Sequence, residues 1–192
     1  KSVLAIEKNV TGSQFFFLTD LYSIKNLFPE EFCGCYGMLT KSGIPKPVFY
    51  AFKMLREVGD DRIMMKNADG TDMILNDIGI AAFRKENDIQ VILMRQRMKN
   101  TELASELTEV IVDMEKEPSR VTIQRIDETH CNPLAMWEDM GSPMIPNTSE
   151  IDEIKKKTAM VEESLPYLYR EGQVKISTEM NVNDIALIKI YA

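Results

Sequence analysis

Short apolar runs separated by polar breaks make up most of this sequence. The first clear run, Phe15-Phe16-Phe17-Leu18, comes shortly after Gly12-Ser13 and is followed by Thr19-Asp20. A short apolar run between turn residues is typical of a strand that is buried on both faces, as in a parallel sheet. The sequence therefore predicts a buried strand here, with the polar side chains of Thr19 and Asp20 emerging at its C-terminal end.

The clearest helical pattern begins at Pro47, after a loop-rich stretch over residues 23–45. Proline suits the first position of a helix because its missing N–H would be unpaired there. Apolar residues then recur at helical spacing and predict one apolar stripe: Val48, Ala51, Phe52, Leu55 and Val58. Gly59 is expected to end the helix as its C′ residue. Strand, loop and helix in this order predict one β/α unit.

After residue 60 the apolar runs become short and closely spaced. Six of them have the length of strands: residues 78–83, 89–94, 107–114, 121–126, 174–178 and 185–191. The polar stretch Arg84-Lys85-Glu86-Asn87-Asp88 separates the first two and predicts a hairpin turn. Short strands at hairpin spacing favour an antiparallel β-sandwich.

Two helices are expected to interrupt this β region. Leu134 to Met140 follow Pro133 and precede Gly141, which suits a short helix. Thr148 or Ser149 could cap a second helix, because Glu150 and Asp152 would then lie in its first turn. Apolar or small residues would share one face of that helix: Ile151, Ile154, Thr158, Val161 and Leu165.

Composition and charge narrow the class of protein. The chain has 192 residues, of which 44% are hydrophobic and 28% charged, as in ordinary globular domains. Its net charge of -7 disfavours nucleic-acid binding by this segment and leaves no polybasic patch for anionic membranes. No apolar run is long enough to span a bilayer, and no signal peptide is visible. With only three cysteines, we expect reduced thiols and a cytoplasmic protein.

Few residues suggest chemistry by their spacing. His130 is the only histidine, so a His-based metal site is not expected. We expect His130 to make a structural hydrogen bond instead. Cys33-Gly34-Cys35 lacks the spacing and the second ligand pair of a zinc site, and no nucleotide-binding motif occurs, so we expect no metal and no cofactor. Most acidic residues lie in polar stretches. Asp20 is the exception, because it follows a buried strand; it could belong to a site or cap the next turn.

Several stretches together resemble one family. They are Gly43-Ile44-Pro45-Lys46-Pro47-Val48-Phe49-Tyr50-Ala51-Phe52-Lys53-Met54-Leu55, Ala81-Ala82-Phe83-Arg84-Lys85, Arg125-Ile126-Asp127-Glu128-Thr129-His130-Cys131-Asn132-Pro133 and Trp137-Glu138-Asp139-Met140-Gly141-Ser142-Pro143. In this order they are similar to the C-terminal part of glycoside hydrolase family 39, the β-xylosidases. The resemblance covers nearly the whole chain.

The resemblance implies a fold class that is mainly β with α. Residues 1–60 would be the terminal strand, loop and helix of a (β/α)₈ barrel that is incomplete here. Residues 61–192 would be an antiparallel β-sandwich accessory domain, with a small helical insertion at about residues 133–165. The chain is thus expected to be a C-terminal fragment of a longer protein.

The same resemblance implies that this chain carries no catalytic residue. The family's acid/base Glu follows an Asn and precedes a Pro or Gly, and its nucleophile is a second Glu at a strand end. Neither Asn-Glu-Pro nor Asn-Glu-Gly occurs in the sequence. We therefore expect no glycosidase activity from this chain alone.

The sugar site that the family would imply looks degenerate here. The family's eighth strand usually reads like YW-T-F-S-D-x-F-E-E, and its aromatic and acidic residues approach the sugar. In this sequence Phe16 replaces the Trp, and Ser23-Ile24 replace the two Glu. The family's F-HGG-F-G segment becomes Phe32-Cys33-Gly34-Cys35-Tyr36-Gly37, so Cys33 replaces its His. The remaining sugar-binding candidates are Phe16, Asp20, Tyr22 and Cys33.

Three hypotheses follow for function. The chain could be the accessory or scaffold region of a β-xylosidase-like protein, and the degenerate strand then favours a sugar-sensing module of an AraC-type transcription regulator. It could instead end an active β-xylosidase, or be an independent carbohydrate-binding sandwich. The implied partners are the rest of the parent barrel, xylose or a xylo-oligosaccharide, a second copy in a homodimer, and DNA only through a missing upstream domain. We expect other chain segments to cover the open sheet edge in residues 1–60.

Overall fold

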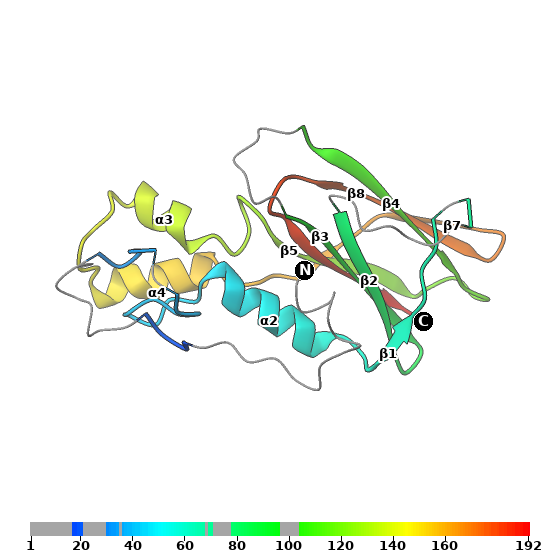
Figure 1. The fold of residues 1–192 in the computed structure, drawn as a ribbon, viewed down its shortest axis with the longest axis horizontal. Coiled ribbons are helices and arrows are strands. Elements are labelled where there is room, and N and C mark those ends of the chain that lie inside the picture. Colours follow the sequence, from blue (N-terminus) through cyan, green and yellow to red (C-terminus); the bar gives the residue numbers. More distant parts are fainter. Residues whose placement is uncertain (1–16, 21–29, 35, 68, 71–77, 97–103) are drawn as a thin grey trace. The chain divides into compact units, whose positions relative to one another are not determined.

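A computed structural model describes residues 17–20, 30–34, 36–67, 69–70, 78–96 and 104–192. Three helices and nine strands are described, with labels as in Figure 1: α2 (Pro47–Glu57), β1 (Asp61–Ile63), β2 (Ile78–Lys85), β3 (Asp88–Arg95), β4 (Glu106–Asp113), β5 (Arg120–Ile126), α3 (Pro133–Asp139), α4 (Thr148–Lys157), β6 (Glu163–Ser164), β7 (Tyr167–Arg170), β8 (Gln173–Met180) and β9 (Ile185–Tyr191). The described part is thus mainly β.

The chain forms two compact units. The first contains the described residues between 56 and 125 and those of 161–192, and the second contains the described residues between 17 and 55 and those of 126–160. Each unit is described below by itself. None of the helices in the described part of the chain combines the length and the apolar character needed to traverse a bilayer.

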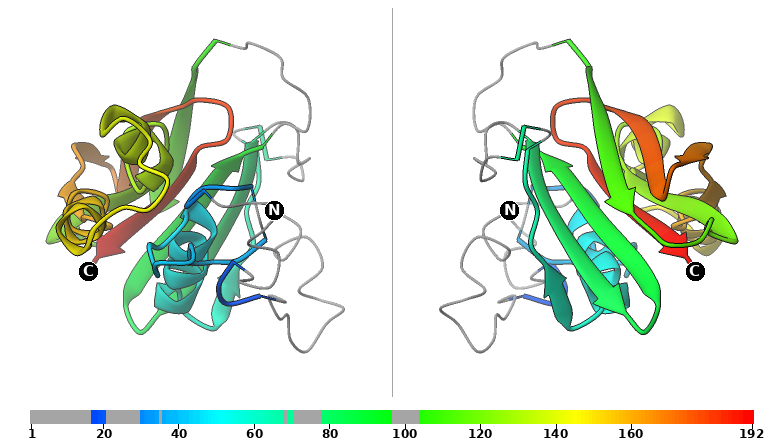
Figure 2. Two further views of the ribbon diagram at one scale, coloured as in Figure 1. Left: turned by 90° about the vertical axis from the view of Figure 1, so that its left-hand side faces the viewer. Right: turned by 90° about the vertical axis from the view of Figure 1, so that its right-hand side faces the viewer.

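The first unit holds two sheets. The large sheet has the strand order β1-β2-β3-β9-β5-β6, and its pairs β1–β2, β2–β3, β3–β9 and β5–β6 are antiparallel. The small sheet has the order β4-β8-β7 and is antiparallel throughout. Figure 2 shows the two sheets from the sides. All six strands expected from the sequence are present in this unit, and β1, β6 and β7 are additional.

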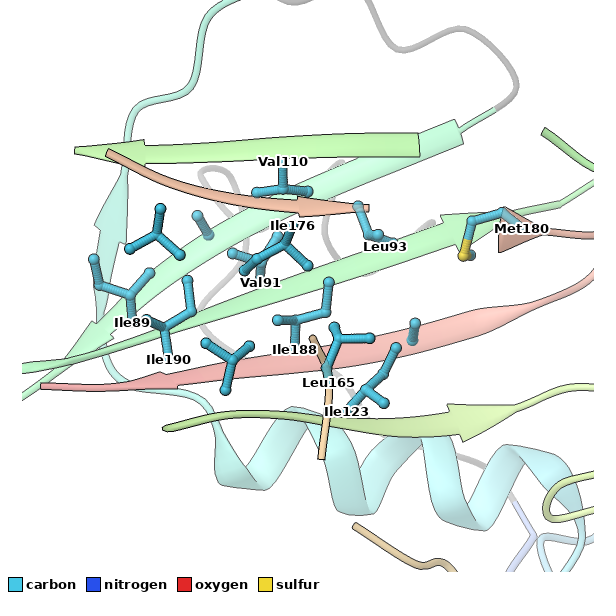
Figure 3. Packing of buried hydrophobic residues seen from close by; sticks show 14 residues of the cluster. Ile89, Val91, Leu93, Val110, Ile123, Leu165, Ile176, Met180, Ile188 and Ile190 are labelled. Atoms are coloured by element: carbon cyan, nitrogen blue, oxygen red, sulfur yellow. The ribbon is translucent and has the colours of Figure 1, made fainter. Parts of the chain in front are cut away.

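One hydrophobic core lies between the two sheets. Strands β2, β3, β5 and β9 contribute residues from the large sheet, and β4 and β8 contribute Val110, Val174, Ile176 and Met180. Figure 3 shows Val110 and Ile176 pointing toward the layer that contains Val91. Alternation along β8, where every second residue is buried, follows from the pleat of a strand with one face on a core.

The central strands of the large sheet are buried on both faces. In β3 the core side holds Val91 and Leu93, while Gln90, Ile92 and Met94 on the opposite side are also buried. In a strand with no face toward solvent, apolar and polar residues need not alternate. This accounts for the continuous apolar run at this position. The hairpin from β2 to β3 needs only residues 86 and 87 as its turn, with Lys85 opposite Asp88.

In the second unit, α3 and α4 pack on a small apolar cluster. Ile44, Trp137 and Ile154 are buried together, and the Phe32 and Trp137 rings lie 5.4 Å apart. The predicted helix at Pro47 is confirmed as α2, and the helix after Pro133 as α3. The buried positions of α2 are Tyr50 and Met54, however, and the five residues of the predicted stripe are only half-buried.

Three local expectations are wrong. Asn147, and not Thr148 or Ser149, caps α4, because its side chain and that of Glu150 form a reciprocal capping box. Leu165 does not extend the face of α4, which ends at Lys157, and belongs to the core between the sheets. Gly59 does follow the end of α2 at Glu57, but it does not have the positive φ of a C′ glycine. A Cβ there would lie 1.9 Å from the carbonyl oxygen of Arg84.

Candidate functional site

Asp20 is the predicted site residue for which the structure gives the most contacts. It is 3% exposed and follows Thr19, which forms an isolated parallel bridge with Leu39. One carboxylate oxygen accepts a hydrogen bond from the backbone N–H of Gly37 at 2.8 Å. Lys46 Nζ lies 2.7 Å from Oδ1 and 2.9 Å from Oδ2. Both oxygens of Asp20 are therefore engaged within the protein.

Gly37 makes this arrangement possible through its lack of a side chain. A Cβ on Gly37 would lie 2.3 Å from the backbone nitrogen of Asp20. Backbone bonds from Met38 N to Phe17 O and from Leu39 N to Leu18 O hold the two segments together. The close approach lets the carboxylate reach the Gly37 amide, so Asp20 fastens the loop that contains residues 36–46. This geometry favours the turn-capping alternative for Asp20 over a role as a sugar ligand.

The structure says less about the other three sugar-binding candidates. Cys33 is a half-buried residue outside any disulfide. Phe16 and Tyr22 lie outside the described residues. The structure therefore does not test whether these four side chains share one site, and their assignment stays a prediction.

Sequence reasoning missed a second buried carboxylate in this region. Glu31 is 4% exposed and accepts hydrogen bonds from the backbone N–H and the hydroxyl of Ser42, at 2.8 and 3.0 Å. Lys155 Nζ also donates to the Ser42 carbonyl oxygen, at 3.4 Å. Glu31 stands with Glu30 between Phe28-Pro29 and Phe32-Cys33. This loop-rich stretch has no periodic pattern that could signal its burial. Like Asp20, it organises the loop that precedes α2.

His130 and Cys131 are structural. His130 Nδ1 lies 2.8 Å from Asp127 Oδ1, as expected for a structural hydrogen bond. Burial alone would raise the pKa of Asp127, but hydrogen bonds from His130 and Thr129 hold this pKa below its usual value. Cys131 is buried, and burial together with the Asp127 charge raises its pKa to about 12. Its thiol therefore stays protonated at neutral pH and is a poor nucleophile.

The first unit contains one strongly connected ionic cluster. Lys189 Nζ on β9 contacts Glu57 Oε2, and it also lies 2.7 Å from Glu162 Oε2. The Tyr191 hydroxyl donates to Glu162 Oε1 at 3.0 Å, and Gln124 Nε2 donates to Glu57 Oε2 at 3.1 Å. Every carboxylate of this cluster is hydrogen-bonded, which indicates a structural role. Within the described ranges, no three His, Cys, Asp or Glu side chains form a group that could hold a metal ion.

Comparison with known proteins decides the family. Residues 2–175 match the glycosyl hydrolases family 39. The chain belongs to this family. The match runs through both compact units and ends just inside β8, so it contains all the described helices and the strands β1 to β7.

Two curated β-xylosidases are similar to this chain over part of their own length. A β-xylosidase of Caldicellulosiruptor saccharolyticus is 27% identical over 149 residues, which are 78% of this chain and 30% of that protein. A β-xylosidase of Geobacillus stearothermophilus is 22% identical over 183 residues, which are 94% of this chain and 34% of that protein. The chain thus spans about a third of the length of these relatives.

Solved family 39 structures share the fold. A monomeric β-xylosidase from Caulobacter crescentus CB15 matches with a TM-score of 0.72 and 17% identity, over 98% of this chain and 39% of that one. The family 39 enzyme from Xanthomonas axonopodis pv. citri gives a TM-score of 0.71 and 15% identity, over 98% of this chain and 38% of that one. The arrangement of helices and antiparallel sheets described above therefore fits part of a larger family 39 fold.

Proposed function

We propose that this chain is the non-catalytic C-terminal region of a family 39 β-xylosidase-like protein. Two comparisons carry the proposal. Residues 2–175 match family 39, and the chain is similar to about a third of each of the two β-xylosidases. Residues 1–60 would contribute the last strand, loop and helix of a barrel. Residues 61–192 would be an accessory β-sandwich with a helical insertion at about residues 133–165. Two sheets around one core support the second assignment.

The chain alone is proposed not to hydrolyse glycosides. Retaining glycosidases need two carboxyl groups about 5–5.5 Å apart at a position open to the sugar. The sequence lacks an Asn-Glu-Pro or Asn-Glu-Gly segment. Asp20 and Glu31, two buried carboxylates of the loop region, are already satisfied by protein donors. Their engagement by protein donors makes them poor replacements for the missing pair.

The sugar site of the parent protein is proposed to be weakened, with Phe16, Asp20, Tyr22 and Cys33 as its remaining candidates. Loss of the two Glu at Ser23-Ile24 removes charge-assisted hydrogen bonds to sugar hydroxyls. The engagement of Asp20 by Lys46 supports the same conclusion. Any ligand would be xylose or a xylo-oligosaccharide, in line with the β-xylosidases among the relatives.

The same degeneracy favours a second candidate function. A barrel that no longer hydrolyses xylosides can serve as a sugar-sensing or scaffolding module, for example behind the DNA-binding part of an AraC-type regulator in the cytoplasm. DNA contacts would then lie in another part of the protein, because this segment is acidic. The sequence of the reading frame upstream of Lys1 decides between the two candidates. A barrel with both catalytic Glu would make the parent a glycosidase, and helix-turn-helix motifs would make it a regulator.

An assay of the chain itself tests the main proposal. The chain is incubated with an aryl β-xyloside, beside an active family 39 β-xylosidase and an Asp20→Asn variant of this chain. We expect release of the aryl group by the β-xylosidase only. Turnover by this chain that keeps a constant specific activity through repurification would overturn the proposal, whether or not the Asp20→Asn variant retains it. Turnover that disappears on repurification would come from a contaminating enzyme.

A further inference from the structure

Within its described ranges, the chain passes between the two compact units at three points, which we call the three connections. They lie between Leu55 and Arg56, between Arg125 and Ile126, and between Met160 and Val161. The first connection falls inside α2, the second at the end of β5, and the third between α4 and β6. Residues beside these points therefore control how the chain leaves and enters the first unit.

One residue beside each connection belongs to the ionic cluster of the first unit. Glu57, Gln124 and Glu162 are each the second residue of this unit, counted from the first, second and third connection. Lys189 on β9 is the residue that contacts both carboxylates. All four residues lie in the first unit. The cluster thus brings together three segments that are far apart in the sequence, each at the place where it joins the other unit.

These four side chains form a closed ring of hydrogen bonds. Glu57 Oε2 accepts from Lys189 Nζ and from Gln124 Nε2, the latter at 3.1 Å. Glu162 Oε2 accepts from the same two donors, at 2.7 and 3.5 Å. Because every member of the ring has two neighbours, the loss of one side chain weakens the contacts of two others.

The orientation of the Gln124 amide depends on this ring. Gln124 is 7% exposed, and its Nε2 is directed toward the two carboxylates, while its Oε1 is buried without a hydrogen-bond partner. The opposite orientation would bring Oε1 against carboxylate oxygens, which have no proton to donate. The two carboxylates therefore determine the orientation of the amide and leave one of its acceptors unpaired.

The charges of the ring make Lys189 its central member. Two carboxylates share one ammonium group, and the three charged side chains are only 13–29% exposed. Charges that are partly withdrawn from water are screened less than charges on the surface, so repulsion between them is stronger. Without Lys189, the carboxylates of Glu57 and Glu162 would repel each other, and the first and third connections beside them would separate.

Backbone pairing joins only two of the three connections. Strands β5 and β6 are antiparallel neighbours, with Ile123 opposite Glu163, so the second and third connections are held together by the sheet. Glu57 is the last residue of α2 and is joined to this sheet through Lys189 and Gln124. The side chains of the ring therefore add the first connection to the other two.

We propose that the ring around Lys189 couples the three connections, so that they open together and not one by one. While the ring is closed, the connections leave the first unit at fixed points. When it opens, they gain freedom, although the core between the two sheets stays folded. Lys189 is then a positioning residue for the passages between the units. The inference concerns the conformational freedom of the chain and is independent of the proposed sugar chemistry.

Hydrogen exchange of the full chain, followed by mass spectrometry under native conditions, tests this coupling. In Lys189→Met, amides of residues 55–57, 124–127 and 163–165 should all exchange about tenfold faster or more, because they exchange through local opening. The three segments should respond together, although they are far apart in the sequence. A change confined to one of them would overturn the proposal.

Two variants of β8 are the controls. Lys175→Met also removes a lysine that is paired with a glutamate, 2.9 Å away, and should leave the three segments unchanged. Val174→Ala shortens a fully buried side chain of the core and should accelerate exchange in the core strands without singling out the connections. Equal changes in both lysine variants would overturn the proposal. So would exchange in Lys189→Met that rises only in step with the core amides, as in Val174→Ala.

A milder variant tests the ring from its first connection. Glu57→Gln keeps the shape of the side chain and removes its charge. Because the ring joins Glu57 to the other segments, exchange should accelerate in residues 163–165 as well as in residues 55–57. Acceleration in residues 55–57 alone would contradict the coupling.

Trypsin provides an independent measurement, because Arg56 and Arg125 stand directly at the first two connections. Cleavage of a folded chain at such bonds follows the population of the locally opened form. Cleavage after both arginines should be about tenfold faster in Lys189→Met than in the wild type, and unchanged in Lys175→Met. Unchanged cleavage in Lys189→Met, or faster cleavage after only one of the two arginines, would overturn the proposal.

Discussion

Lys46 donates hydrogen bonds to both carboxylate oxygens of Asp20, with N–O distances of 2.7 and 2.9 Å. The Asp20 side chain is fully buried and the Lys46 side chain is 15% exposed. A buried pair of this kind is costly to break on one side, because the remaining charge is left without a partner. The pair joins residues 26 positions apart in the sequence. It therefore links the end of the first predicted strand to the residue before α2.

Replacement of Asp20 by alanine should destabilise the second unit by about 3 kcal/mol. The substitution leaves Lys46 unpaired and the Gly37 amide without its acceptor. Urea unfolding followed by fluorescence measures the effect, because Trp137 is the only tryptophan and lies in the same unit. Glu153→Ala, which breaks an exposed pair with Lys157, is the control and should cost about 0.5 kcal/mol or less. Equal losses would show that the Asp20 pair contributes little.

Replacement of Lys189 by methionine should destabilise the first unit by about 2 kcal/mol, because Glu57 and Glu162 then face each other without the shared cation. Lys175→Met removes an exposed pair with Glu109 on the same unit and should cost about 0.5 kcal/mol or less. Thermal unfolding followed by circular dichroism compares the two variants. A loss in the Lys189 variant no larger than in the Lys175 variant would contradict the structural role of the cluster.

The same cluster predicts how stability depends on pH. Burial raises the pKa of Glu162, but hydrogen bonds from Lys189 and Tyr191 outweigh it and hold this pKa below its usual value. Glu162 thus stabilises the fold above its unfolded pKa of about 4.3, and this contribution is lost as the pH falls through the lower folded pKa. Burial lowers the pKa of Lys189, but Glu162 and Glu57 outweigh it and raise this pKa. That contribution is full below about pH 10.4 and is lost as the pH rises through the higher folded pKa.

Glu162→Gln isolates the acid side of this dependence. The variant should be less stable than the wild type near neutral pH, and the difference should shrink as the pH falls below about 4. Urea midpoints measured across the pH range give the comparison. A difference that stays constant down to strongly acid pH would mean that the charge of Glu162 does not contribute to stability.

A pair of threonines with buried hydroxyl groups offers a stabilising change. Thr108 on β4 lies opposite Thr178 on β8, and neither hydroxyl has a hydrogen-bond partner. Valine has nearly the same shape and no polar atom, so T108V/T178V should stabilise the first unit by about 1 kcal/mol per hydroxyl. Ser177→Ala, on the exposed face of β8, is the control and should have little effect. A loss of stability in the double variant would show that the hydroxyls are hydrogen-bonded in solution.

Alanine substitutions at two glycines distinguish the cost of a steric clash from the cost of an unfavourable backbone conformation. Gly59→Ala places a Cβ 1.9 Å from the Arg84 carbonyl oxygen, so backbone must move and the cost should be about 3 kcal/mol or more. Gly172 has a φ of +78°, but its nearest neighbour, Met114 O, would be 3.6 Å from a Cβ. Gly172→Ala should therefore cost about 1 kcal/mol, the strain of a left-handed alanine. Equal costs would contradict the close approach at Gly59.

The sequence predicted elements with strong local signals and missed those that depend on distant partners. Pro47 and Pro133 located the starts of α2 and α3, and apolar runs located six strands. Strand β7 was not predicted, because Tyr167–Arg170 is short and none of its residues is fully buried. Leu165 was placed on a helix because it continues the spacing of Ile154, although the chain leaves the helix at Thr158.

The candidate site was predictable only in part for the same reason. The position of Asp20 after an apolar run indicated a special environment. Its partner Lys46 and the amide of Gly37 could not be inferred, because no periodic pattern connects loops that meet through tertiary structure. The burial of Glu31 could not be inferred either, because the loop-rich stretch around it has no periodic pattern that separates a buried glutamate from an exposed one.

The place of β9 in the large sheet has a consequence for biosynthesis. Residues Ile185–Tyr191 lie between β3 and β5, so a strand that is synthesised after all the other described strands joins two parts of the sheet that were made earlier. While the ribosome still holds these residues, β1-β2-β3 and β5-β6 are separate pieces with exposed apolar edges. The large sheet can close only after Tyr191 has left the exit tunnel, so its two halves cannot pair with each other during most of the synthesis of this region.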